Sequence, residues 1–262
     1  MSGTPRLRLA AFAYHDVADD PSTSGLQRPT AVSYKLPVAL FRAHLDAIAA
    51  SGQPVGQPVT ALEPDADASH VVLTFDDGGR SALAVAEELS RRGWAGHFLI
   101  VSDRIGTPGF VAPADLRHLV ETGHVVGSHS RTHPDVFSAE SEARMREEWR
   151  ASRARIEDIT GAPCVVASVP GGDSSPLVVG TAAEAGIRVL FTSEPEVRPQ
   201  WAGDCLVVGR MSPRQRTPAR RIGELASFRG WDRELRQRRL KLFARRLVFP
   251  LYRRWSHSLP RG

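Results

Sequence analysis

Short apolar runs recur along the 262-residue chain, and each has the length of a buried strand. Between most of them, apolar residues are spaced three or four positions apart, as on one face of an amphipathic helix. The strand-like runs cover residues 7–14, 71–75, 96–101, 124–127, 163–168, 187–192 and 205–209. The helical patterns cover residues 36–48, 82–92, 114–121, 138–159 and 177–185. This alternation predicts an α/β domain with a mainly parallel sheet covered by helices.

The strand predicted over residues 71–75 ends at two adjacent carboxylates and a glycine, Asp76-Asp77-Gly78. In parallel α/β sheets, ligands and catalytic groups collect at the edge formed by the carboxyl ends of the strands. Neighbouring residues that leave a strand point in different directions, so Asp76 and Asp77 can have different roles. A simple turn at Asp77-Gly78 that closes the strand is the alternative interpretation.

Two histidines, His129 and His133, follow the strand predicted over residues 124–127 and are therefore expected at the same sheet edge. If residues 129–133 form a helical turn, the two rings lie on one face, with Cβ atoms about 5–6 Å apart. Two neutral imidazoles and one carboxylate are the ligand set of a hydrolytic zinc site or of a related Fe(II), Co or Mn site. A purely structural role is the alternative for either histidine.

Taken together, the two segments resemble the motifs of a known family. Residues 74–78, Thr-Phe-Asp-Asp-Gly, resemble the first motif of the polysaccharide deacetylases that contain a NodB homology domain, the carbohydrate esterase family 4 type. Residues 129–133, His-Ser-Arg-Thr-His, match the second motif, His-Ser/Thr-x-x-His. The resemblance implies a distorted (β/α)7 barrel. It assigns residues 1–212 to a catalytic domain and leaves residues 213–262 as a basic helical C-terminal extension.

The resemblance also implies roles for individual residues. Asp76 corresponds to the catalytic base of the family, while Asp77, His129 and His133 correspond to the ligands of one divalent metal. Zinc is the first candidate for this metal, with cobalt or nickel as alternatives. The implied reaction removes the N-acetyl group of an amino sugar or glycan intermediate and releases acetate. The implied partner is therefore an N-acetylated sugar.

Two parts of the sequence depart from the family pattern. Residues 167–173 correspond to the third motif and keep Pro170, Gly171 and Gly172, which are expected to line the substrate groove. They lack the arginine that orients the catalytic aspartate in the family. The last predicted strand lacks the Leu-x-His histidine that serves many members as general acid. Either another part of the chain supplies the orienting group and the general acid, or the site lacks them.

Two residues could fill these gaps. His15 follows the first predicted strand, which a closed barrel brings close to the last strand. Arg210 leaves that last strand at the same edge. We therefore predict that His15 donates the proton to the leaving amine and that Arg210 holds Asp76 or the oxyanion. The alternative for His15 is a purely structural role. The alternative for Arg210 is that it is simply the first residue of the basic tail.

The departures leave three functions open: a metal-dependent N-deacetylase, a deformylase that acts on a related amino sugar, and a catalytically impaired protein that binds glycans or serves as a scaffold. The retention of Asp76 favours an active enzyme, because a binding protein has no evident need for a base beside the metal ligand.

The net charge of +5 is unevenly distributed. Residues 210–262 contain sixteen basic and three acidic side chains, whereas residues 1–209 contain eighteen basic and twenty-six acidic ones. From residue 229 onward the pattern predicts a basic amphipathic helix with interspersed aromatic residues and a kink at Pro250. Such a helix suits an anionic membrane surface or a glycosyltransferase partner. Packing on the barrel is the alternative, and nucleic acid fits less well because no recognised binding motif accompanies the charge.

The apolar run at residues 9–13 is too short for a signal peptide, and no run is long enough to cross a bilayer. The two cysteines, Cys164 and Cys205, have no closely spaced partner and are expected to be buried thiols. These features predict a cytoplasmic protein that is peripheral at the inner face of the membrane if its tail binds lipid.

Overall fold

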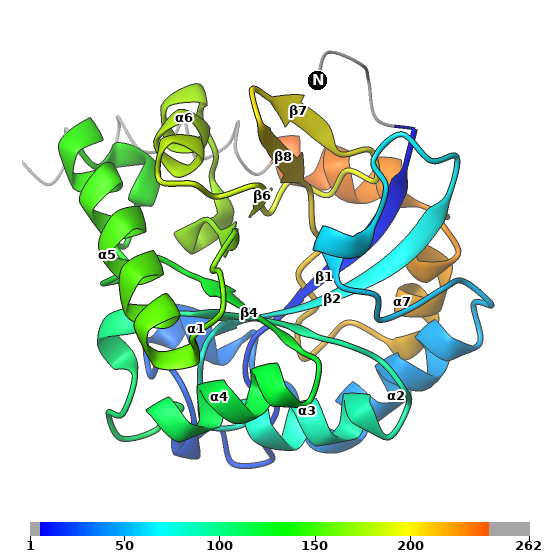
Figure 1. The fold of residues 1–262 in the computed structure, drawn as a ribbon. Coiled ribbons are helices and arrows are strands. Elements are labelled where there is room, and N and C mark those ends of the chain that lie inside the picture. Colours follow the sequence, from blue (N-terminus) through cyan, green and yellow to red (C-terminus); the bar gives the residue numbers. More distant parts are fainter. Residues whose placement is uncertain (1–5, 241–262) are drawn as a thin grey trace, which may run out of the picture.

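The computed structural model describes residues 6–240, and these residues form a curled sheet covered on its outer face by helices (Figure 1). The sheet is 8-stranded, with the order β1-β2-β3-β4-β5-β6-β8-β7. The strands are β1 (Arg8–Tyr14), β2 (Ser69–Asp77), β3 (His97–Ile100), β4 (Val125–Ser128), β5 (Val166–Ser168), β6 (Val189–Phe191), β7 (Gln200–Ala202) and β8 (Cys205–Val208). All neighbours pair in parallel except β7, which pairs antiparallel with β8.

Helices connect most of the parallel strands, as the spacing of apolar residues predicts. The principal helices are α2 (Val38–Ala49), α3 (Ala82–Ser90), α4 (Pro113–Glu121), α5 (Glu142–Thr160), α6 (Pro176–Glu184) and α7 (Ala219–Ala226), and residues 231–240 are also helical. The shorter turns are α1 (Pro29–Val32), η1 (Pro21–Thr23), η2 (Val59–Ala61), η3 (Ser102–Arg104), η4 (Phe137–Ala139) and η5 (Pro170–Gly172). Within residues 6–240, no helix is long and apolar enough to cross a membrane.

The sheet closes only partly between its first and last parallel strands. Beyond β8, Met211 makes a single parallel bridge to Phe12 of β1. The Met211 N–H donates to the carbonyl of Ala11 over 2.9 Å, and the Ala13 N–H donates to the carbonyl of Met211 over 2.8 Å. The predicted distorted (β/α)7 arrangement is confirmed, because the seven parallel strands coincide with the seven apolar runs. Strand β7 was not predicted.

The alternation of side chains along each strand separates the interior of the barrel from its helix-covered face. In β2, Val71, Leu73 and Phe75 pack in the cluster that includes the buried faces of α2 and α3. Val72 instead packs in a second cluster with inward-facing residues of other strands, including Leu99 and Phe191. By the same alternation, Asp76 lies on the inward face of β2. This geometry points one carboxylate of the Asp76-Asp77 pair into the barrel.

The basic extension is described only as far as residue 240. Its first part packs on the barrel, because Trp231 is buried and its ring centroid lies 6.1 Å from that of Phe12 in β1. Arg238 forms ion pairs with Asp173 and Glu194, which belong to loops of the barrel. The predicted continuation of the basic helix and the kink at Pro250 lie outside the described residues.

Candidate metal and catalytic site

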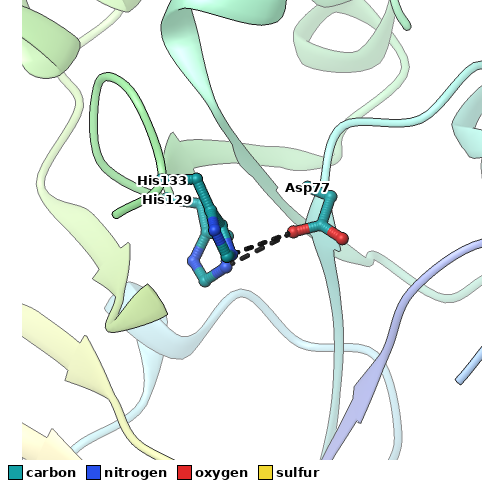
Figure 2. Close-up of side chains that lie close together, drawn as sticks. All are labelled: Asp77, His129 and His133. Atoms are coloured by element: carbon teal, nitrogen blue, oxygen red, sulfur yellow. Dashed lines mark ion pairs between the residues drawn. The ribbon is translucent and has the colours of Figure 1, made fainter. Parts of the chain in front are cut away.

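The two carboxylates at the end of β2 have different backbone conformations. Asp76 keeps the inward direction of the strand. Asp77 has a φ of 78°, in the left-handed region that non-glycine residues rarely adopt. Its carboxylate consequently lies beside the rings of His129 and His133 (Figure 2). Backbone strain of this kind is typical of functional sites.

Asp77, His129 and His133 form a compact set of potential metal ligands. Asp77 Oδ1 lies 3.5 Å from His129 Nε2 and 3.6 Å from His133 Nε2, and the ligand atoms of the three residues all lie within 4.8 Å of one another. Two atoms bound to one zinc ion at about 2.1 Å in tetrahedral geometry would be about 3.4 Å apart. Asp77 Oδ1 is buried and accepts no hydrogen bond from the described part of the chain. The set therefore fits a divalent cation.

Residues 129–133 form a loop rather than a helical turn, so the helical geometry considered from the sequence is wrong. Ser130 and His133 have left-handed backbones, with φ values of 65° and 58°. The His133 N–H donates to Ser130 Oγ over 3.1 Å, and the Ser130 N–H donates to Ser128 Oγ over 3.1 Å. The two imidazole rings still converge, with centroids 4.9 Å apart.

Hydrogen bonding and burial prepare the imidazoles to bind a cation. His129 Nδ1 donates to two oxygens of Ser168, the hydroxyl Oγ (2.6 Å) and the carbonyl (3.1 Å). The lone pair of the ring is therefore on Nε2, the atom near Asp77. Burial lowers the pKa of His129 to about 3 and also lowers the pKa of His133. Both rings are therefore neutral, which is the form that coordinates metals. Burial raises the pKa of Asp77 to about 6.

Asp76 is held by Arg210 in a two-point ion pair inside the barrel. Arg210 Nη1 lies 2.7 Å from Oδ1 of Asp76, and Nη2 lies 2.8 Å from Oδ2. The guanidinium also donates to Thr74 Oγ1 over 2.7 Å and to the carbonyl of Thr192 over 3.1 Å. Burial alone would raise the pKa of Asp76, but the charge of Arg210 outweighs it and holds the pKa below its ordinary value. Asp76 is therefore a carboxylate at neutral pH.

His15 lines a small cavity together with Asp76 and Gly78. The His15 ring packs against Tyr34, with centroids 4.9 Å apart. Its Nδ1 is buried and has no hydrogen-bond partner within residues 6–240. The structure thus brings together the two residues proposed from the sequence to replace missing family groups, His15 and Arg210, around one aspartate.

The segment predicted to line the substrate groove forms the η5 turn directly after β5. Pro170 and Gly172 are buried, whereas Gly171 is exposed. A Cβ on Gly171 would lie 3.9 Å from the carbonyl oxygen of Asp135, two residues beyond His133. Of these three residues, Gly171 is therefore the one that presents surface to a ligand beside the histidine loop.

Sequence reasoning missed two groups that complete the geometry. Ser168 links both halves of the site, because its hydroxyl contacts His129 and donates to Asp76 Oδ1 over 3.2 Å. Glu148, on α5, accepts hydrogen bonds from the loop that contains the histidines. The only available signal for Ser168 was its position at the end of a predicted strand, and nothing in the local pattern pointed to Glu148.

Comparisons with known proteins agree with this geometry. The family model for polysaccharide deacetylases matches residues 63–190. The fold is similar to that of a polysaccharide deacetylase from Bacillus cereus, with 18% identity, coverage of 84% of this chain and 69% of that chain, and a TM-score of 0.69. It is also similar to the deacetylase PplD of Streptococcus pyogenes, with 16% identity, coverage of 85% and 99%, and a TM-score of 0.68. At these identities the structural likenesses establish the fold alone.

One curated relative is an uncharacterized 30.6 kDa protein of Geobacillus stearothermophilus. It is 25% identical over 132 residues, which are 49% of this chain and 48% of the relative, so the match spans about half the length of that protein. The family resemblance predicted from the two motifs is confirmed, because both motifs lie within residues 63–190, which match the family model for polysaccharide deacetylases.

Proposed function

We propose that this protein is a metal-dependent hydrolase that removes the N-acetyl group of an amino sugar or glycan intermediate and releases acetate. The family supports deacetylase activity on an N-acetyl amide and implies an N-acetylated glycan as substrate. The related deacetylase PplD has been solved in complex with acetate, the product expected here. The observation that carries the proposal is the unpartnered Asp77 oxygen, which faces two neutral imidazoles next to an ionised Asp76.

Asp77, His129 and His133 would hold one divalent cation, with zinc as the first candidate and cobalt or nickel as alternatives. When bound, such a cation supplies Lewis acidity that polarises the acyl oxygen and activates water. The neutral rings of His129 and His133 would offer their Nε2 lone pairs to the cation. The Asp77 carboxylate would offer a negative charge, which burial disfavours when no cation is bound.

Asp76 is the base that we assign to the attacking water. Arg210 fixes both of its oxygens and keeps it ionised, while Ser168 donates a further hydrogen bond to Oδ1. All of the nitrogen atoms of the guanidinium contact Asp76, Thr74 or Thr192, so Arg210 is a positioning residue for the base rather than a donor to the oxyanion. This contact weakens the case for an impaired binding protein, because that case rested partly on the missing arginine of the third motif.

His15 is the proposed general acid. Its unpartnered Nδ1 lies at the cavity that also contains Asp76, so a proton on this atom is not committed to another acceptor among the described residues. Packing against Tyr34 fixes the ring. A proton donated from His15 would go to the amine nitrogen as the carbon–nitrogen bond breaks.

The C-terminal extension is proposed to bring the enzyme to the cytoplasmic face of an anionic membrane or to a glycosyltransferase there. This proposal rests on the excess of basic residues in the sequence after residue 210. Arg238 and Arg239 are engaged in ion pairs with the barrel, so the proposal concerns the residues beyond Leu240.

The metal site is tested by metal content and acetate release. Wild-type protein loaded with Zn²⁺ and desalted should retain about one ion per chain. His133→Ala should retain none and should not release acetate from N-acetylglucosamine oligomers. His118→Ala, which changes an exposed histidine on α4, is the matched control and should behave as wild type. Equal metal content in wild type and His133→Ala would contradict the assignment of the ligands.

Replacement of Arg210 by methionine should change the pH dependence of the reaction. Without the guanidinium, burial of Asp76 is no longer offset and its pKa rises. The acid limb of the kcat/KM profile should therefore move to higher pH, while Arg210→Lys, which keeps a positive charge, should shift it less. The methionine variant should also lose about 3–5 kcal/mol of stability, because a buried charge loses its partner. An acid limb in the same place as in wild type would argue against Asp76 as the base.

Replacement of His15 by glutamine should lower kcat by about 10²–10⁴-fold, the usual contribution of a general acid, with little change in metal content. Tyr34→Phe keeps the ring that packs on His15 and should retain most of the activity. The readout is initial acetate release at saturating substrate. Wild-type turnover in His15→Gln would remove this residue from the mechanism.

Membrane binding is tested by co-sedimentation with vesicles that contain phosphatidylserine. The full chain should bind these vesicles more strongly than pure phosphatidylcholine vesicles, and high salt should weaken the binding. A chain that ends at Leu240 keeps the part that packs on the barrel and should not sediment. If both chains sediment equally, the extension beyond Leu240 is not the membrane anchor.

A further inference from the structure

One buried carboxylate outside the proposed metal and base residues supports the histidine loop. Glu148 lies on α5 and is fully buried. Its Oε2 accepts the N–H groups of Arg131 and Thr132, over 2.8 and 2.7 Å. Its Oε1 accepts the Thr132 hydroxyl over 2.7 Å and pairs with Arg144 Nη2 over 2.7 Å. Each oxygen of the carboxylate thus has two donors.

The donors from the loop lie between the two candidate metal ligands, at the second and third positions after His129. The loop departs from regular structure, because Ser130 and His133 both have left-handed backbones. Consecutive backbone N–H groups in such a turn form a concave donor site that suits an anion. Glu148 supplies that anion from a helix, which is a rigid element, so the loop conformation is fixed from α5.

The two histidines depend on the loop to different extents. The ring of His129 is oriented by Ser168, which accepts the hydrogen bond from Nδ1. The Nδ1 of His133 is buried and has no partner among the described residues. The position of the His133 ring therefore follows from the backbone of the loop. Glu148 holds the N–H groups of that backbone, while the Ser102 and Asp103 N–H groups donate to its Ser130 and Arg131 carbonyls.

We propose that Glu148 is a positioning residue that sets His133 against His129 and Asp77, and thereby sets the affinity and ligand geometry of the cation site without touching the cation. The buried Glu148 carboxylate is paired with Arg144, whose side chain is 42% exposed and reaches in from the protein surface. Charge-assisted hydrogen bonds of this kind are short and strong. This inference rests on the proposed metal-dependent function.

The test measures cation affinity in Glu148→Gln by competition with a chromogenic zinc chelator. The glutamine oxygen can accept the two backbone N–H groups, but its amide nitrogen then faces Arg144, so the ion pair is lost and the loop is held less firmly. We expect the Zn²⁺ dissociation constant to rise about 10–100-fold, as for other groups that orient metal ligands. The visible spectrum of the Co²⁺-loaded variant should also change in band position and intensity, because it reports ligand geometry.

A matched control lies on the same helix. Glu157 Oε1 accepts the Cys164 N–H over 3.0 Å and pairs with Arg153 over 3.0 Å, so it also anchors a loop to α5, but on the side away from the histidines. Glu157→Gln should leave the Zn²⁺ dissociation constant and the Co²⁺ spectrum as in wild type. Thr132→Val removes one hydrogen bond to Glu148, keeps a similar volume, and should weaken binding less than Glu148→Gln.

The outcomes separate this inference from the proposed function. Wild-type affinity and an unchanged Co²⁺ spectrum in folded Glu148→Gln would overturn the role of Glu148 and leave the metal site standing. A wild-type protein that binds neither Zn²⁺ nor Co²⁺ would overturn both. If Glu148→Gln does not fold, Thr132→Val decides: weaker binding supports the inference, and unchanged binding overturns it.

Discussion

The interaction on which the site depends is the buried ion pair between Asp76 and Arg210. It joins residues 134 positions apart in the chain, at the ends of β2 and β8, inside the barrel. An unpaired carboxylate at this depth would be strongly disfavoured, so the inward-facing Asp76 requires a cation from another strand. Closure of the sheet beside β1 provides it, because the chain after β8 pairs with β1 and places Arg210 next to β2.

This pair gives two adjacent carboxylates opposite electrostatic environments. Arg210 holds the pKa of Asp76 below its ordinary value, whereas burial raises the pKa of Asp77 to about 6. Two titratable groups whose environments push their pKa values apart are suited to different tasks in one reaction. The left-handed backbone of Asp77 makes this separation possible, because it takes the second carboxylate out of the barrel interior and toward the histidines.

Rigid elements support each candidate functional side chain. Asp76 and Ser168 lie on strands, and Arg210 lies two residues beyond the end of β8. The histidine loop itself is irregular, but Glu148 on α5 accepts the N–H groups of Arg131 and Thr132, and Ser128 Oγ accepts the N–H of Ser130. Loops offer the backbone conformations that bring ligands together, and contacts to helices and strands fix those conformations.

The sequence by itself determined the seven parallel strands, the helices α2 to α6, the two motif segments and their common sheet edge, whereas α7 was not predicted. These features depend on local periodicity and on residue types that lie within a few positions of one another. Only the tertiary structure decided that Arg210 pairs with Asp76, that Ser168 links the base to His129, and that Glu148 holds a non-helical histidine loop. Strand β7 was missed because its residues are mostly exposed and lack an apolar pattern. The long-range contacts arise from closure of the barrel, which no local pattern encodes.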